Sequence, residues 1–345
     1  MGMRTIQIGL LGYGLAGSTF HAPLIRTIPS LTIAAVMTSR QADVARDLPG
    51  ARVVDSAAAI FTDPAIELVV VATPNASHFE LARQALEAGK HVVIDKPMTT
   101  SSADADALIA LATRQGRLLS VYQNRRWDND FLTVRKLVEA GRLGTIYAYE
   151  SHFDRFRPAI KPGWHEIPQP GAGVLFDLGS HLIDQALVLF GMPTTVTADV
   201  LAQRSEALVD DYFHVILGYG ERRAIVHAST LVREPGPRFA VHGDAGSFVK
   251  YGMDPQETAL KAGRPANAPD WGREDPALSG TLVNAAGERQ LITSEPGAYP
   301  EFYAQMTAAI FTGAPLPVSA QSARDVVAVI ELAHQSAVEH RTVVP

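Results

Sequence analysis

A glycine-rich turn near the start of the chain could bind a diphosphate. Gly12-Tyr13-Gly14-Leu15-Ala16-Gly17 follows an apolar run at residues 5–11 and matches the GxGxxG spacing. In such a turn the first glycine permits a tight bend, the second lets a pyrophosphate approach the backbone, and the third lets the next helix pack closely. The free N–H groups and the dipole at the start of that helix favour negative charge. These six residues are therefore predicted to bind a dinucleotide.

The residues after the second apolar run, 31–37, indicate which dinucleotide binds. An NAD site usually has Asp or Glu about 20 residues past the glycines, where the carboxylate holds the ribose 2′-OH. Here the sequence has Thr38, Ser39 and Arg40. A hydroxyl and a guanidinium pair well with a 2′-phosphate, which a carboxylate would repel. NADP is therefore predicted, with NAD as the less favoured cofactor, although Ser39 could also cap the helix that follows.

Polar residues follow two later apolar runs and a third group lies further along the chain. Thr73-Pro74-Asn75 and Asp95-Lys96-Pro97 each end a strand-like run, and ligands of open α/β sheets lie beyond the carboxyl ends of strands. Asp177 and His181 are four residues apart, so they share a face if their segment is helical. Asp177 and His181 could also be an ordinary pair on a helix surface, and Lys96 could simply lie on the protein surface. The other residues expected beside the cofactor are His78, Asn124 and Arg125.

The two parts of the chain that must position these residues differ in hydrophobic pattern. Over residues 1–123 apolar runs alternate with helical stretches, which predicts a doubly wound parallel α/β sheet, a Rossmann domain. Over residues 124–345 strand-like runs follow one another with few helices, which predicts an α+β domain with a large, mainly antiparallel sheet. The expected strands are residues 5–11, 31–37, 67–73, 90–95, 117–121, 146–156, 195–201, 212–217, 223–230 and 238–241. Helices are expected at 173–190, 299–312 and 319–339, the last of which could return to the first domain, and a surface excursion at 254–280.

The composition is that of an ordinary soluble globular protein. The 345 residues are 47% hydrophobic, carry a formal charge of −6 and include no cysteine. The lack of a basic run argues against a nucleic-acid or membrane-surface partner, and the lack of thiols excludes disulfides and a thiolate zinc site. No signal peptide, no run near the ~18 apolar residues that span a membrane and no convincing metal spacing of histidines is found. We expect a cytoplasmic protein that acts on a small molecule without a metal.

Together these motifs resemble the glucose–fructose oxidoreductase/inositol dehydrogenase/rhizopine-catabolism (Gfo/Idh/MocA) family over nearly the whole chain. Asp95-Lys96-Pro97 is similar to the family's acidic-Lys-Pro motif, with Asp in place of the commoner Glu. Asp177, Gly179, His181 and Asp184 match its D-x-G-x-H-x-x-D helix. Residues 123–131 and 246–257 resemble the branch that contains NADP-dependent scyllo-inositol dehydrogenases.

The resemblance implies an enzyme that transfers a hydride between NADP and a secondary alcohol of a cyclic polyol or sugar. In that reaction His181 would accept the hydroxyl proton, Lys96 would stabilise the alkoxide and Asp177 would bind a substrate hydroxyl. The sequence does not choose between Lys96 and His181 as the proton acceptor. Phe153 and Trp164 are further expected in the substrate pocket.

Two other functions stay open at this point, together with the oligomeric state. Some family members are NAD-dependent glycosidases that use transient oxidation, and repressors that resemble the family are non-catalytic dinucleotide sensors. The presence of Lys96, Asp177 and His181 counts against a sensor, which needs phosphate contacts but no proton relay. A homodimer or homotetramer that pairs through the C-terminal sheet is expected, because a sheet with one uncovered face often pairs with another.

Overall fold

The computed structural model describes residues 4–160, 163 and 166–345, and in it the chain forms two compact units. The first unit comprises the chain up to Asn124 together with Gln256–Trp271 and Tyr299–Arg324. The second comprises Arg125–Pro255, Gly272–Ala298 and Asp325–Pro345. The domain boundary expected between residues 123 and 124 stays a prediction.

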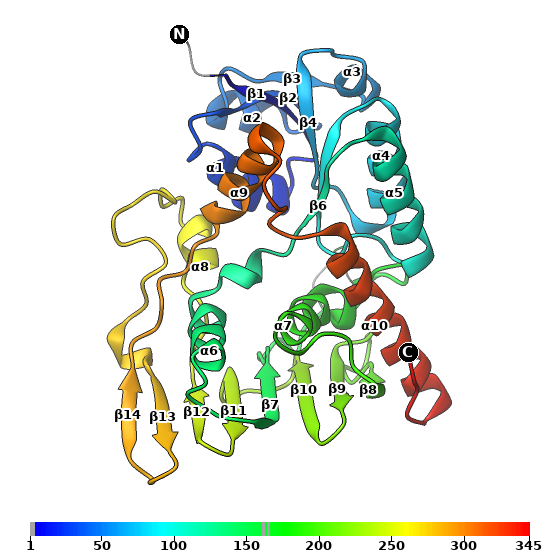
Figure 1. Ribbon diagram of the computed structural model, residues 1–345. Coiled ribbons are helices and arrows are strands. Elements are labelled where there is room, and N and C mark those ends of the chain that lie inside the picture. Colours follow the sequence, from blue (N-terminus) through cyan, green and yellow to red (C-terminus); the bar gives the residue numbers. More distant parts are fainter. Residues whose placement is uncertain (1–3, 161–162, 164–165) are drawn as a thin grey trace. The chain divides into compact units, whose positions relative to one another are not determined.

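The first unit contains a sheet of six parallel strands in the order β3-β2-β1-β4-β5-β6 (Figure 1). Because β1 and β4 are neighbours although two strands separate them in sequence, the sheet has the switch point at which such folds bind ligands. The predicted doubly wound parallel sheet is confirmed, although the sequence pattern did not locate the short β3 of this sheet. The strands are β1 (Ile6–Leu11), β2 (Leu31–Met37), β3 (Arg52–Val54), β4 (Ile66–Val71), β5 (His91–Asp95) and β6 (Leu119–Tyr122).

Helices flank this sheet. Helices α4 (His78–Glu87) and α5 (Ser102–Gln115) pack together on one side, and α1 (Ala22–Ile25) contacts α9 (Pro300–Thr312) on the other (Figure 1). Helix α5 begins where the Ser101 hydroxyl accepts a hydrogen bond from the Asp104 N–H, and it ends at the left-handed Gly116. The other helices of this unit are α2 (Gln41–Asp47), α3 (Ala58–Phe61) and α8 (Gln256–Lys261).

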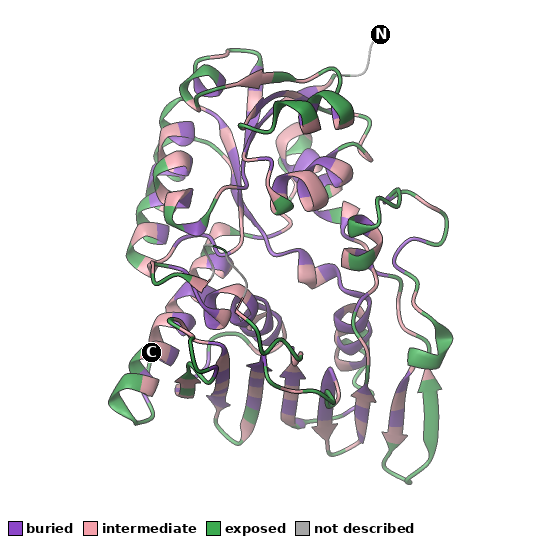
Figure 2. Ribbon diagram, turned by 180° about the vertical axis from the view of Figure 1, so that it is seen from behind, coloured by how far each residue is buried: buried purple, intermediate pink, exposed green. Residues whose placement is uncertain are grey.

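The second unit contains a sheet of eight strands in the order β14-β13-β12-β11-β7-β10-β9-β8. All neighbours are antiparallel except β7 and β10, so the predicted mainly antiparallel sheet is confirmed. Alternate residues along most of its strands are buried (Figure 2), and the buried face packs with α6 (Asn129–Glu139) and α7 (Ser180–Phe190) in one core. The strands are β7 (Ile146–His152), β8 (Thr195–Leu201), β9 (Tyr212–Tyr219), β10 (Arg222–Ser229), β11 (Phe239–Gly243), β12 (Gly246–Lys250), β13 (Gly280–Asn284) and β14 (Arg289–Ile292).

Two expectations about local structure are corrected. Residues 173–190 do not form one α-helix, because Leu175–Gly179 is wound as a π-helical turn and α7 begins at Ser180. Residues 254–280 are not wholly a surface excursion, since they supply α8 and the buried Trp271, whose indole N–H donates to Gln256 Oε1 at 2.9 Å. The two final helices are confirmed as α9 and α10 (Ala320–Glu339). Within the described residues, no helix has the length and apolar character needed to cross a membrane.

Candidate functional site

The glycine turn after β1 leaves room for a ligand at one of its three glycines. A Cβ atom at Gly12 would lie 2.5 Å from the Ala72 carbonyl oxygen, and one at Gly17 would lie 2.1 Å from the Gly12 carbonyl oxygen. Gly12 also has a φ of +95°, which favours glycine. At Gly14 a Cβ would meet no atom within 4 Å. The first and third glycines are thus required by the fold itself, whereas the second faces open space.

The helical segment that follows the turn can accept an anion. The π-helical turn Ala16–His21 has no side chain capping its N-terminus and no acidic residue in its first turn, and it continues directly into α1. Its first N–H groups therefore suit a diphosphate. The Tyr13 side chain is buried, and its hydroxyl donates to Asp47 Oδ2 at 3.3 Å. Burial and the neighbouring Asp47 raise the pKa of Tyr13 to about 12.

The segment after β2 presents hydroxyl and guanidinium groups to solvent. Ser39 and Arg40 are exposed, and the Arg40 N–H donates to Thr38 Oγ1 at 3.1 Å. Helix α2 begins at Gln41 with Arg40 at its N-cap, so Ser39 does not cap that helix. Capping of α2, the alternative role that the sequence left open for Ser39, is therefore ruled out.

His78 joins the loops that follow β4 and β5. Its Nδ1 lies 2.8 Å from the Pro97 carbonyl oxygen and its Nε2 lies 2.9 Å from the Thr73 carbonyl oxygen. Burial lowers the pKa of His78, so its neutral ring donates to one of the two carbonyls. The structure thus brings the Thr73-Pro74-Asn75 and Asp95-Lys96-Pro97 segments together, with a cis bond between Lys96 and Pro97. His78 and Asn75 are buried, whereas Pro74 is exposed and Lys96 is half-buried.

Asp177 and His181 lie on consecutive helical segments in the second unit. Asp177 is half-buried in the π-helical turn, and His181 is buried in the first turn of α7. The His181 ring lies edge-on to Phe153, with 6.5 Å between ring centroids. The guanidinium groups of Arg125 and Arg238 lie 4.9 and 4.1 Å from the centroid of the same Phe153 ring. The Phe153 ring therefore packs beside His181 and beside both guanidinium groups.

The start of the Asp177 segment is fixed by a residue that the sequence analysis did not find. Asp210 Oδ2 accepts a hydrogen bond from the Leu175 N–H at 2.7 Å. A Cβ atom at Gly173 would lie 2.0 Å from Asp210 Oδ1, so the glycine allows this approach. Burial raises the pKa of Asp210 to about 6 despite these backbone hydrogen bonds. Asp210 was not predicted because it lies 35 residues from Leu175 in the sequence, and no local pattern indicates that the two meet.

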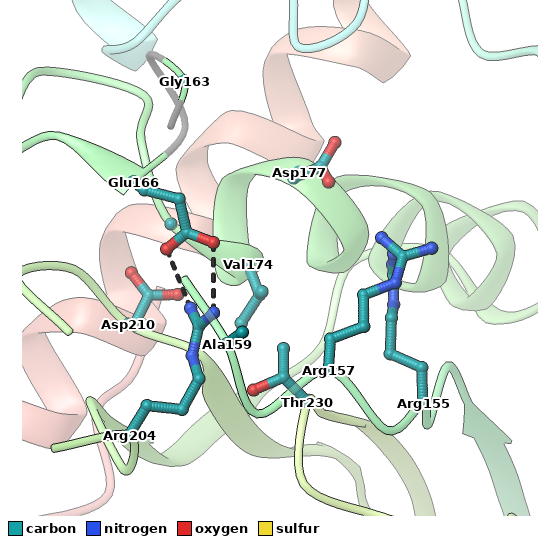
Figure 3. Close-up of a pocket in the computed structure, with 11 residues that line it drawn as sticks. Arg155, Arg157, Ala159, Gly163, Glu166, Val174, Asp177, Arg204, Asp210 and Thr230 are labelled. Carbon is teal, nitrogen blue, oxygen red and sulfur yellow. Dashed lines mark hydrogen bonds and ion pairs between the residues drawn. The ribbon is translucent and has the colours of Figure 1, made fainter. Parts of the chain in front are cut away.

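Asp177 also lines a pocket that is rich in charged side chains (Figure 3). Arg155 and Arg157 reach into it from the segment after β7, and Arg204 forms an ion pair with Glu166 at 2.8 Å. Trp164, which we expected in the substrate pocket, lies outside the described residues. The polar lining suits a hydroxylated or charged small molecule rather than an apolar one.

Asp184 has a structural partner. Its carboxylate accepts two hydrogen bonds from Arg126, at 2.8 Å from Nε and 2.6 Å from Nη2, and both side chains are largely buried. The next residue, Gln185, donates to the Arg125 carbonyl oxygen and accepts from Arg238. These bonds tie α7 to Arg125 and Arg126, so Asp184 orders the helix that carries His181.

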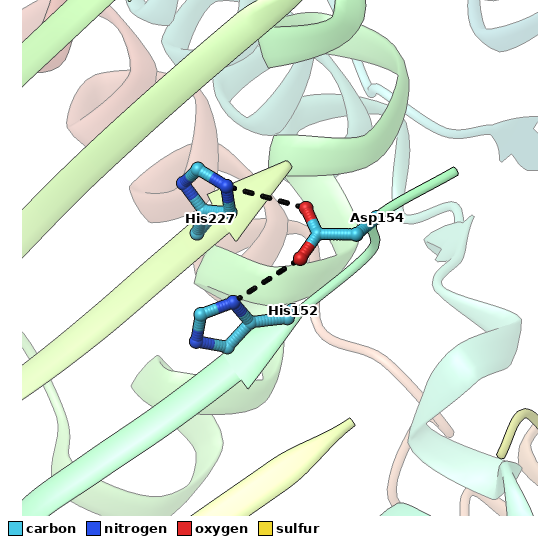
Figure 4. Close-up of side chains that lie close together, drawn as sticks. All are labelled: His152, Asp154 and His227. Atoms are coloured by element: carbon cyan, nitrogen blue, oxygen red, sulfur yellow. Dashed lines mark ion pairs between the residues drawn. The ribbon is translucent and has the colours of Figure 1, made fainter. Parts of the chain in front are cut away.

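His152, Asp154 and His227 gather on the second sheet (Figure 4). Asp154 lies 3.5 Å from His152 Nδ1 and 3.2 Å from His227 Nε2, and one ligand atom from each of the three could reach a common ion. Burial raises the pKa of Asp154, but the two histidines outweigh it and hold that pKa below its ordinary value. Among the described residues, His227 Nδ1 has no hydrogen-bond acceptor of the kind a metal-bound imidazole usually has. The contacts of the Asp154 carboxylate with one nitrogen of each ring hold the three side chains together.

Two models of one protein family match the chain. The model described as "Oxidoreductase family, NAD-binding Rossmann fold" matches residues 6–123, and the one described as "Oxidoreductase family, C-terminal alpha/beta domain" matches residues 135–344. The chain belongs to the Gfo/Idh/MocA oxidoreductase family. The predicted resemblance is confirmed, and the matched Rossmann domain supports a nicotinamide dinucleotide as the cofactor of this family member.

Relatives match this Gfo/Idh/MocA chain over nearly its full length. The scyllo-inositol 2-dehydrogenase (NADP(+)) IolW of Bacillus subtilis is 46% identical over 98% of this chain and 96% of that protein. The oxidoreductase YdgJ of Escherichia coli is 46% identical over 97% of both chains. The solved structure of the oxidoreductase YvaA of Bacillus subtilis has a TM-score of 0.98 at 45% identity, covering 100% of this chain and 99% of that one.

Proposed function

We propose that this oxidoreductase is an NADP-dependent dehydrogenase of a secondary alcohol on a cyclic polyol or sugar of the inositol type. The observation that carries the cofactor choice is the end of β2, where Thr38 and the exposed Ser39 and Arg40 stand in place of a carboxylate. A 2′-phosphate would find hydroxyl donors and a guanidinium there, and no repelling charge among those three residues. The relative named scyllo-inositol 2-dehydrogenase (NADP(+)) supports both the cofactor and the substrate class.

The diphosphate would lie against Gly14 and the first N–H groups of Ala16–His21, which have the open space and the polarity it needs. When bound, the nicotinamide supplies a two-electron acceptor for the carbinol carbon. The neutral imidazole of His181 would take the hydroxyl proton, and the Lys96 ammonium would stabilise negative charge on the carbinol oxygen. Asp177 would accept a hydrogen bond from a substrate hydroxyl.

The cofactor proposal is tested by Arg40→Asp, with binding of NADPH and NADH measured separately by fluorescence titration. Loss of a charge-assisted hydrogen bond to phosphate costs about 1.5 to 3 kcal/mol, so the Kd for NADPH should rise at least tenfold. The Kd for NADH should change less than about threefold, because its ribose carries no phosphate. Arg114→Asp, an equal charge change at an exposed position of α5, is the matched control. Equal losses for NADPH and NADH in Arg40→Asp would refute the assignment.

The reaction is tested by nicotinamide absorbance during turnover, with NADP⁺ and NAD⁺ each offered against inositols, aldoses and linear polyols. Reduction of NADP⁺ by a ring polyol is expected, with kcat reduced about 10²- to 10⁴-fold in His181→Ala and Lys96→Ala. His340→Ala, at an exposed position, should retain wild-type turnover. Tight NADPH binding without net reduction of NADP⁺ would instead favour a glycosidase or a sensor. A glycosidase would cleave glycosides with the cofactor retained, whereas a sensor would not.

We also propose that the chain forms a dimer or tetramer through its second sheet. Leu201 on β8 and Leu291 on β14 are exposed, by 44% and 72% respectively, and both lie in edge strands of that sheet. Light scattering at micromolar concentration should give a multiple of 37.0 kDa. A mass of one chain would contradict the proposal.

A further inference from the structure

The carboxylate that precedes Lys96 lies at the end of a buried chain of polar groups in the first unit. Asp95 Oδ1 accepts a hydrogen bond from the Lys96 N–H at 2.9 Å and lies 3.8 Å from His21 Nε2. The other ring nitrogen of His21, Nδ1, lies 2.6 Å from the Tyr303 hydroxyl. Three segments distant in sequence therefore meet behind Lys96: the π-helical turn Ala16–His21, the end of β5 and helix α9.

His21 and Tyr303 have no access to solvent, so their hydrogen-bond partners must be other groups of the protein. Both side chains are 0% exposed, and the His21 ring packs on Tyr122 with 4.5 Å between centroids. Burial and the Asp95 charge raise the pKa of Tyr303 well above its ordinary value, so its hydroxyl keeps its proton at neutral pH. A protonated hydroxyl 2.6 Å from an imidazole nitrogen can donate its hydrogen to that nitrogen.

This donation selects one tautomer of His21. If Nδ1 accepts from Tyr303, it carries no proton, so the ring proton of His21 lies on Nε2, which is the nitrogen that faces Asp95. The distance of 3.8 Å is too long for a hydrogen bond but short enough for the N–H dipole to attract a carboxylate. The opposite tautomer would place a lone pair against the same carboxylate and would leave the Tyr303 hydroxyl without this acceptor.

Asp95 needs such support because it is largely buried. Burial raises the pKa of Asp95, but the contact with His21 and the charge of Lys96 outweigh it, so the carboxyl stays ionised well below neutral pH. An ionised Asp95 can hold the Lys96 N–H through Oδ1 and present a negative charge beside the Lys96 side chain. The conformation of Lys96 therefore depends, through Asp95, on His21.

We propose that Tyr303, His21 and Asp95 are positioning residues that form a buried relay, in which Tyr303 fixes the tautomer of His21 and His21 holds the Asp95 carboxylate against the backbone of Lys96. The proposal rests on the proposed role of Lys96 in the oxidation of an alcohol. The sequence indicates the Asp95 end of this relay alone, because residues 21, 95 and 303 meet only in the folded chain.

The tautomer can be measured without any substrate. In the protein labelled with ¹⁵N-histidine, the ring signals of His21 are assigned by their loss in His21→Gln. We expect the wild type to have a protonated Nε2 and an unprotonated Nδ1. In Tyr303→Phe the ¹⁵N chemical shift of Nδ1 should change, because Nδ1 loses the hydrogen bond from the Tyr303 hydroxyl. A protonated Nδ1 in the wild type, or His21 signals unchanged in Tyr303→Phe, would overturn the relay. This measurement decides the relay even if no alcohol is turned over and the proposed function fails.

Steady-state kinetics then test whether the relay acts on Lys96. Loss of one hydrogen bond that positions the site should lower kcat about fivefold in Tyr303→Phe, with each KM changed less than about twofold. Asp95→Asn should lower kcat further, and Asp95→Glu, which keeps the charge, should restore most of it. Tyr149→Phe removes an equally buried hydroxyl from the second unit and should leave kcat unchanged. An unchanged kcat in Tyr303→Phe with a lower melting temperature would mean that the three residues serve packing alone.

Discussion

Replacement of Gly14 by alanine should separate cofactor binding from folding. Gly14 has no atom within 4 Å of a built Cβ, so the alanine fits the cofactor-free protein without strain. Reduced chain entropy in the unfolded state should leave the free energy of unfolding unchanged or raise it by up to about 1 kcal/mol. The methyl group would occupy the space through which a diphosphate approaches the backbone. Loss of one backbone N–H bond to an anion costs about 1.5 to 3 kcal/mol, so the Kd for NADPH should rise about 10- to 100-fold.

Alanine substitutions at two other glycines, Gly17 and Gly50, serve as comparisons for Gly14→Ala. In Gly17→Ala the new Cβ would lie 2.1 Å from the Gly12 carbonyl oxygen, so the helix must move and the protein should lose about 1 to 3 kcal/mol of stability. Gly50→Ala, also in open space but in the loop after α2, should change neither stability by more than about 1 kcal/mol nor NADPH binding. The assays are urea unfolding and NADPH fluorescence titration on all three variants. Wild-type affinity in Gly14→Ala would refute the placement of the diphosphate.

Three further predictions concern charged groups of the second unit and are checked by urea unfolding. Asp184→Asn weakens the buried bidentate pair with Arg126 and should cost about 3 to 5 kcal/mol; a loss under 1 kcal/mol would contradict this. Because the pKa of Asp210 is raised to about 6, the folded protein binds more protons than the unfolded chain above pH 4 or so, and stability from this group falls as the pH rises toward 6. Asp210→Asn should abolish this fall of up to about 3 kcal/mol, and an equal pH slope in both proteins would refute it. Lys250→Met leaves the buried Glu274 unpaired and should lower the free energy of unfolding by about 3 to 5 kcal/mol. Adding Glu274→Gln to the same chain should recover part of this loss. If the losses of the two substitutions add instead, the two residues do not stabilise the protein as a pair.

Most of the fold could be predicted because its strands are local and strongly patterned. The continuous apolar runs of β1, β2, β4 and β5 indicate strands buried on both faces, and the structure has them in one parallel sheet. The last three strands, β12–β14, escaped prediction because they are short and carry polar residues near an open edge. The association of α8 and α9 with the first unit was also beyond reach, since nothing local in a helix reveals which core will bury it.

The candidate site was predictable where the chemistry lies in a contiguous motif. Gly12–Gly17, Asp95-Lys96-Pro97 and Asp177–His181 are each short segments whose residue types suggest their use. The supporting contacts join residues far apart in sequence, as Asp210 does with Leu175 and Tyr303 does with His21. The two π-helical turns were not predicted either, because a turn that is wider by one residue leaves no trace in a pattern of apolar spacing.

The distribution of the proposed residues between the two units makes their roles experimentally separable. Every residue proposed to bind the cofactor except Arg125 belongs to the first unit, whereas Asp177 and His181 belong to the second, which has its own sheet and core. Variants at Gly14 or Arg40 should therefore change NADPH binding in the absence of any substrate. Variants at Asp177 or His181 should leave that binding within about twofold and act on turnover. Lys96 belongs to the first unit but is proposed to act on the substrate oxygen, so Lys96→Ala should bind NADPH and fail in turnover; a variant that loses both would identify Lys96 as a cofactor contact first.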